Sequence, residues 1–205
     1  MTLGGRTYQW RIGADAVSNA NGRHWREWRA WRDDPTARHY LYRSLWELMR
    51  TLPHAERSRA LEELGQWAGA TQPHSADSRP LTHEELVSLA GCELFELGCH
   101  TRTHPMLSAL DAASQREEIA GSKRDLERIT GAEPKSFAYP YGQPFAFSQM
   151  AIELVREAGF QTACANFPGS AGPGADPLQL PRLHVDNWDG EEFTRMLSEW
   201  FDGRW

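Results

Sequence analysis

The feature that most constrains the fold is a regular alternation of short apolar runs with helical patterns, which starts near Leu81 and continues to the end of the chain. The expected strands are 94–97, 135–140, 159–165 and 178–185, and the expected helices are 82–90, 111–131, 148–158 and 189–201. Strands that alternate with helices in this way run in the same direction, because each helix carries the chain back across the sheet. The sequence therefore predicts an α/β fold with a parallel sheet or barrel.

Local signals mark the ends of these helices. Thr82 and Glu85 have the spacing of a capping box, and Asp111 and Asp189 are expected N-caps. Gly131 is the expected end of the longest helix.

The part before residue 81 differs in character, since it holds six of the nine tryptophans. The stretch 37–52 has apolar residues at helical spacing, and Pro53 is expected to open a second helix that ends at Gly69. We therefore divide the chain into a Trp-rich helical segment, 1–80, and a main domain, 81–205.

Trp25, Trp28 and Trp31 share one face of a further possible helix. Packing of this face against the protein is favoured over sugar stacking on exposed indoles. Five histidines away from the expected strand ends are interpreted as solvated: His24, His39, His54, His74 and His83.

Composition excludes several classes of protein. The net charge of −6 argues against a dedicated nucleic-acid surface. No apolar stretch approaches the roughly 20 residues that span a bilayer, and no signal segment follows Met1, so a cytoplasmic protein is expected. The three cysteines form no C-x-x-C pattern, and Cys99 is interpreted as a small buried side chain. The oligomeric state stays open.

The segment "LGCHTRTHPML" places His100 and His104 where the strand 94–97 runs out. Alone, this spacing is weak evidence for a metal site, and a pair of hydrogen-bonded loop histidines explains it better. However, ligand sites in parallel α/β folds gather at the carboxyl ends of strands. The runs "FAYPYG" and "LPRLHV" end two other expected strands at the same edge, which favours a functional site there.

These three segments together resemble the polysaccharide deacetylases, carbohydrate esterase family 4. "HTRTHP" is similar to the family's metal-binding motif H-[ST]-x-x-H-P, "FAYPYG" to its substrate-groove motif and "LPRLHV" to the last motif of one branch. The resemblance covers about residues 81–200. It implies a distorted (β/α)7-type barrel, here incomplete at its N-terminus and carrying an inserted helical pair.

The resemblance also implies a function: a metal-dependent hydrolase, acting on carbon–nitrogen bonds other than peptide bonds, that removes N-acetyl groups from an amino-sugar polysaccharide or glycoconjugate. His100 and His104 would hold a divalent metal, usually zinc. The Tyr141 backbone N–H would stabilise the oxyanion and His184 would protonate the departing amine. Tyr139, Pro140 and Tyr141 would border the substrate. Arg182 would also serve the substrate site, and is expected to be buried and paired with a carboxylate.

One family motif is missing: the strand that ends in two aspartates, one a metal ligand and the other the general base. The pair Asp33–Asp34 has no apolar strand before it and no glycine after it, and is better explained as the start of a helix. Either these residues precede Met1, or the protein is a shortened, inactive relative. We therefore expect the 205-residue chain to be inactive or nearly so. The alternative function is a non-catalytic carbohydrate- or partner-binding protein.

Overall fold

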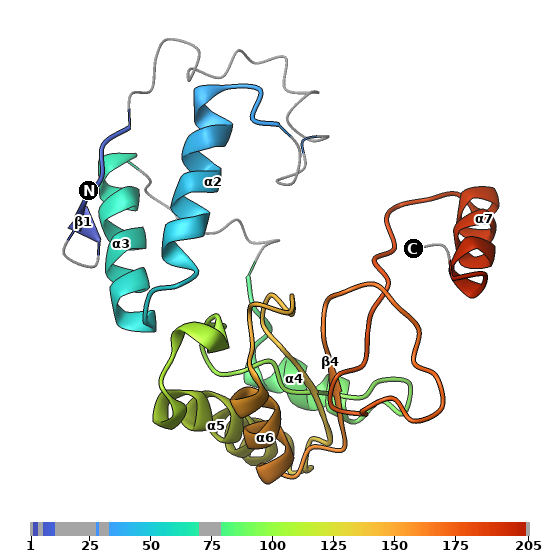
Figure 1. The fold of residues 1–205 in the computed structure, drawn as a ribbon. Helices are drawn as coiled ribbons and strands as arrows, with labels where there is room; N and C mark the ends of the chain where they lie inside the picture. The colour runs from blue at the N-terminus through green and yellow to red at the C-terminus, as the bar shows by residue number, and fades with distance from the viewer. Residues whose placement is uncertain (1, 4–5, 11–27, 29–32, 70–78, 204–205) are drawn as a thin grey trace. The chain divides into compact units, whose positions relative to one another are not determined.

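The computed structural model describes residues 2–3, 6–10, 28, 33–69 and 79–203 (Figure 1). The chain divides into two compact units, Met1–Ser75 and Ala76–Trp205, and each is described by itself. None of the helices in the described ranges is long and apolar enough to cross a bilayer.

Among its described residues, the first unit contains two helices and a small antiparallel hairpin. The hairpin pairs β1, Thr2–Leu3, with β2, Arg6–Thr7. The helices are α2, Ala37–Met49, and α3, His54–Trp67, the second of which follows Pro53 as its N-cap. This confirms the predicted helical pair. Asp34 lies just before α2 and forms an ion pair with Arg43 at 3.0 Å, in agreement with a helix-start role.

His39 corrects the expectation that it is solvated. Its side chain is buried in α2, where Nδ1 lies 2.9 Å from the Thr36 hydroxyl and the ring lies 4.6 Å from that of Trp28. Burial lowers the pKa of His39. Trp28 also contacts Tyr42 edge-on, which agrees with packing for this indole, whereas Trp25 and Trp31 lie outside the described residues.

The second unit has four α-helices among its described residues, and all begin where the sequence predicts. They are α4, His83–Ala90; α5, Ala112–Thr130; α6, Gln149–Glu157; and α7, Gly190–Phe201. Asp111 and Asp189 accept hydrogen bonds from the first-turn N–H groups of α5 and α7. Gly131 ends α5 at φ 74°, a conformation that glycine adopts without the clash of a Cβ.

The second unit also contains a narrow parallel sheet. Strand β3, Ser136–Ala138, pairs in parallel with β4, Thr162–Cys164. Single bridges extend the sheet on both sides, from Cys99 to Phe137 and from Leu180 to Cys164. A parallel α/β arrangement is thus confirmed, but the described residues do not form a closed barrel.

All four predicted strands differ from expectation, since β3 and β4 cover only part of 135–140 and 159–165 and the other two segments form no strand. The run 94–97 is not a strand, and Leu94 and Phe95 are exposed, so pairing is limited to Cys99. In 178–185 only Leu180 pairs. A strand forms only where a neighbour offers its backbone groups, and among the described residues these two segments offer only the single bridges at Cys99 and Leu180.

The core of this unit fills the space between the sheet, α5 and α6. Tyr139 stacks on Phe147 with ring centroids 4.1 Å apart and contacts Phe137 edge-on at 5.3 Å. Ile119 and Val155 bring α5 and α6 into the same cluster, and both are fully buried. Cys99 also belongs to this cluster, as predicted, and burial raises the pKa of its thiol.

The capping box of α4 supplies a pH-dependent prediction. The Glu85 carboxylate accepts from two Arg79 nitrogens and from the Thr82 backbone N–H, and these bonds lower its pKa from 4.5 to about 2. The stabilisation is therefore complete above pH about 4.5 and is lost as the pH falls towards about 2. Glu85→Gln should lower stability at neutral pH, and the difference from wild type should shrink over this range in urea denaturation. Glu93→Gln, outside the helix, is the matched control; an equal pH-dependent loss there would contradict the prediction.

Candidate functional site

The first component of the site is His100, which follows the bridge residue Cys99 at the end of its strand segment. Cys99 and Ala138 are joined by a hydrogen bond from Ala138 N to Cys99 O at 2.8 Å. The Ala138 carbonyl oxygen lies 2.7 Å from His100 Nδ1. Because a carbonyl oxygen only accepts, Nδ1 carries the proton, and Nε2 is left with the lone pair that a metal ion needs.

His104 and Tyr141 complete a row of three rings. The His100 and His104 ring centroids lie 4.8 Å apart, and those of His104 and Tyr141 lie 5.0 Å apart. The structure thus brings together the predicted metal ligands and the predicted oxyanion residue, which come from two adjacent strand ends. His100 and His104 are solvent-exposed and Tyr141 is half-buried, so an external molecule can reach them.

Unfavourable backbone conformations coincide with this row. Within the described part of the chain, the non-glycine residues with positive φ are Thr101 at 66°, His104 at 56° and Tyr141 at 62°. The left-handed region is costly for residues with a Cβ, and such residues concentrate at functional sites. All three lie in the two segments that the sequence singled out.

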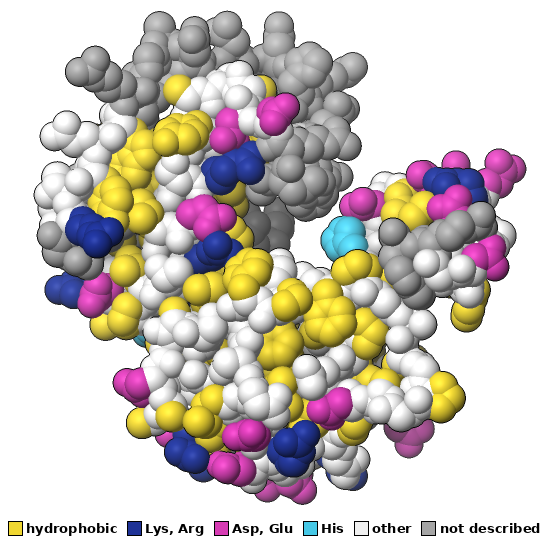
Figure 2. All heavy atoms as spheres, in the orientation of Figure 1, with side chains coloured by type: hydrophobic (Ala, Val, Ile, Leu, Met, Phe, Trp, Pro, Cys, Tyr) yellow, Lys and Arg dark blue, Asp and Glu magenta, His cyan; other side chains and the backbone are white. Residues whose placement is uncertain are grey.

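Hydrogen bonds hold the histidine loop, residues 100–104, in this conformation. The Thr101 hydroxyl accepts from His104 N at 3.0 Å and donates to the His100 carbonyl oxygen. Glu118 of α5 accepts from the backbone and side chain of Thr103 and from the backbone of Arg102. The Arg102 side chain forms ion pairs with Glu117 and Asp125 at 2.8 Å each. Acidic and basic side chains lie interspersed over α5 and α6 in Figure 2.

The Tyr141 turn is held from β4. Asn166 donates from Nδ2 to Tyr141 O at 3.1 Å and from its backbone N to Gly142 O at 2.8 Å. Gly142 has φ 68°, and a Cβ there would lie 2.6 Å from the Asn166 Cβ, so this close approach requires glycine.

Tyr139 and Pro140 do not face the site. Both side chains are fully buried, and the Tyr139 hydroxyl donates to Leu178 O at 2.9 Å. Burial, with the negative charge of Asp176 adding to it, raises the pKa of Tyr139. Both side chains are therefore buried where the sequence predicted contact with a substrate, and the substrate role of Tyr139 and Pro140 stays a prediction.

Arg182 differs from expectation, whereas the predicted role of His184 is not tested. Arg182 is exposed rather than buried, and its Nε donates to the Ala165 carbonyl oxygen instead of a carboxylate. A backbone acceptor is available there because Ala165 follows β4. His184 is exposed and lies 3.3 Å from Asp186. Its role as an acid stays a prediction.

The donor set fits part of a zinc site. Two adjacent imidazoles, one with its proton fixed on Nδ1, are the ligand type that zinc prefers, whereas catalytic zinc sites use three protein ligands. Among the described residues, no group of three or more His, Cys, Asp or Glu side chains is arranged to hold a metal ion. The described residues therefore offer two imidazoles of the expected ligand type, without a third side chain arranged beside them.

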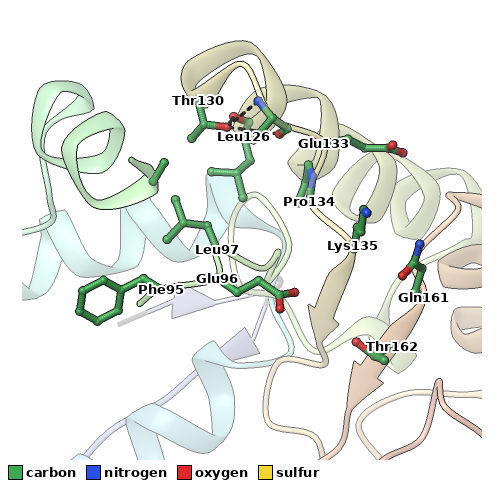
Figure 3. Close-up of a pocket in the computed structure, with 12 residues that line it drawn as sticks. Phe95, Glu96, Leu97, Leu126, Thr130, Glu133, Pro134, Lys135, Gln161 and Thr162 are labelled. Atoms are coloured by element: carbon green, nitrogen blue, oxygen red, sulfur yellow. Dashed lines mark hydrogen bonds between the residues drawn. The ribbon is translucent and has the colours of Figure 1, made fainter. Parts of the chain in front are cut away.

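Two depressions adjoin α5, and both have Leu126 in their lining. One, of about 570 Å³, is lined by residues 98–103, which include His100 but not His104, and by Ser122, Asp125 and Leu126 of α5. The other, of about 360 Å³, is lined by residues that precede or begin the strands, among them Leu97, Lys135 and Thr162 (Figure 3). Sites in parallel α/β folds lie at the carboxyl ends, which favours the first.

Comparison with known proteins supports the resemblance. Residues 64–163 match the family model for polysaccharide deacetylases, and this part of the chain belongs to that family. No curated protein matches the chain in sequence.

Solved structures show the same fold. A deacetylase from Streptococcus pyogenes in complex with acetate is similar over 58% of this chain and 52% of its own, with a TM-score of 0.52 and 19% identity. A polysaccharide deacetylase from Bacillus cereus is similar over 68% of this chain and 47% of its own, with a TM-score of 0.50 and 21% identity. The match thus spans about half the length of each relative.

Sequence reasoning missed two residues of the site. Glu118 is one of several acidic residues on α5, and Asn166 follows β4 without any motif. The available signal was position: Asn166 stands just past the end of a predicted strand, at the edge where the histidines were expected.

Proposed function

We propose that the chain carries part of the active site of a metal-dependent hydrolase that removes N-acetyl groups from an amino-sugar polysaccharide or glycoconjugate. The observation that carries this proposal is the row of the His100, His104 and Tyr141 rings at the carboxyl ends of two parallel strand segments. His104 and Tyr141 themselves, together with Thr101, have positive φ. The family match over 64–163 supports the class of reaction.

In this proposal His100 and His104 hold a divalent metal, with zinc as the expected ion. When bound, zinc polarises the acetamide carbonyl and lowers the pKa of water towards about 7. The Ala138 carbonyl keeps the His100 proton on Nδ1, so Nε2 is the ring atom that would bind the metal. The Tyr141 N–H donates to the oxygen on which negative charge develops.

His184 is the proposed acid that protonates the departing amine, with Asp186 as its neighbour. Arg182 fixes the segment that carries His184, because its backbone N donates to Phe167 O and its side chain to Ala165 O. The third metal ligand and the general base of the family are not identified among the described residues.

Sugar binding and acetate release test the proposal together. With Zn²⁺ present, an N-acetylglucosamine oligomer should shift the backbone amide resonances of Tyr141 and Gly142, and the same oligomer without acetyl groups should not. Acetate release should be close to the rate without protein, since loss of a general base alone costs about 10²–10⁴ in rate.

The outcomes separate the candidate functions. Brisk acetate release would support the enzyme and contradict the expected inactivity of this chain. Equal shifts with both oligomers would indicate the alternative, a non-catalytic carbohydrate-binding protein. The absence of any shift at Tyr141 and Gly142 would contradict a substrate site at this edge.

A further inference from the structure

A single carboxylate of α5 binds the centre of the histidine loop. Glu118 Oε2 accepts from Arg102 N at 2.8 Å and from Thr103 N at 2.9 Å, and Oε1 accepts from Thr103 Oγ1 at 2.6 Å. Consecutive backbone N–H groups of the loop thus point at one side-chain anion. Charge-assisted bonds of this kind are stronger than bonds between neutral groups.

The bonds to Glu118 lie in the part of the loop between the His100 and His104 imidazoles. Arg102 and Thr103 lie between Thr101 and His104, both of which have left-handed backbone conformations. Such a conformation persists only when its surroundings hold it, and the bonds to Glu118 are the contacts described for the backbone N–H groups between them.

Glu118 itself has a fixed position. Its neighbour Ile119 is fully buried in the core, and α5 is a continuous helix of 19 residues. Arg102 adds a second anchor through Glu117 and Asp125, and Gly121 leaves room for it, since a Cβ there would lie 2.6 Å from Arg102 Cδ. The histidine loop is therefore attached to the helix and does not depend on the sheet alone.

We propose that Glu118 is a positioning residue: it holds the loop in the conformation that brings the His100 and His104 imidazoles to one metal ion. The metal part of this inference rests on the proposed function, whereas the loop-ordering part does not. Glu118 does not touch the metal or the substrate. Its effect is on the geometry of the two ligands.

The test uses the full chain with Glu118→Ala, Glu118→Gln and, as matched control on the same helix, Glu127→Gln. Hydrogen exchange of the Arg102 and Thr103 amides is measured without metal. Zn²⁺ affinity is then measured from the ring resonances of His100 and His104. Glu118→Ala should lose amide protection and bind Zn²⁺ roughly 10–100-fold more weakly, the usual effect of removing a partner outside the ligand shell.

Glu118→Gln should restore most of both properties, because its carbonyl oxygen can accept both backbone N–H groups. Glu127→Gln should match wild type. Wild-type protection of Arg102 and Thr103 in Glu118→Ala would overturn the proposal, as would unchanged Zn²⁺ affinity. If wild type binds no Zn²⁺ at these rings, the metal site of the proposed function fails, and the exchange measurement alone decides the role of Glu118.

Discussion

Replacing His100 by alanine should weaken Zn²⁺ binding by more than about 100-fold, since loss of a partner outside the ligand shell already costs about 10–100-fold. The imidazoles of His100 and His104 are adjacent, and no third protein ligand is arranged beside them among the described residues, so one ring alone cannot replace the pair. His104→Ala should have an equal effect. Isothermal titration calorimetry with Zn²⁺ measures both.

The control is His83→Ala, an exposed histidine at the start of α4. It should bind Zn²⁺ as wild type does. A double substitution of His100 and His104 should be no worse than either single change, because each single change already removes the site. Wild-type affinity in His100→Ala would show that these imidazoles are ordinary loop residues.

Tyr139→Ala should destabilise the second unit by about 3–5 kcal/mol, the usual cost of removing a buried aromatic ring. The ring is 0% exposed, stacks on Phe147 and donates from its hydroxyl to Leu178 O. The substitution leaves a cavity between β3 and α6 and an unpaired carbonyl at Leu178. Urea denaturation followed by circular dichroism measures the loss.

Two further variants separate the contribution of the Tyr139 ring to stability from that of its hydroxyl. Tyr139→Phe keeps the ring and removes only the hydroxyl, so it should cost about 1–3 kcal/mol. Phe201→Ala removes an aromatic ring that is 85% exposed and should change stability little. A stability loss in Tyr139→Ala no larger than that in Phe201→Ala would contradict the assignment of Tyr139 to the core.

The helices of the second unit could be predicted because their signals are local. Thr82, Asp111 and Asp189 are caps whose side chains bond to N–H groups three residues later, and the sequence shows both partners. Strands lack such local signals, because their hydrogen-bond partners lie in other segments of the chain. Leu94–Leu97 is as apolar as a strand, but its pairing depends on another segment, and among the described residues a bridge forms only at Cys99.

The site could be predicted in part for a similar reason. The strand-end positions of His100, His104 and Tyr141 follow from the α/β alternation, and the structure places their rings in a row. Glu118 could not be identified, because its partners lie in a loop 15 or 16 residues earlier in the chain. The burial and the carboxylate partner expected for Arg182 were both wrong, since the residue is exposed and its Nε donates to the Ala165 carbonyl oxygen.

The peptide group of Ala138 has a consequence for how this edge tolerates sequence change. Its oxygen holds the His100 ring while its neighbouring N–H joins the sheet at Cys99. The tautomer of the imidazole is thus selected by main-chain atoms, which every amino acid possesses. Substitutions at position 138 that preserve the strand should therefore leave the His100 tautomer unchanged. The tautomer depends on the position of the backbone and not on the side chain at position 138.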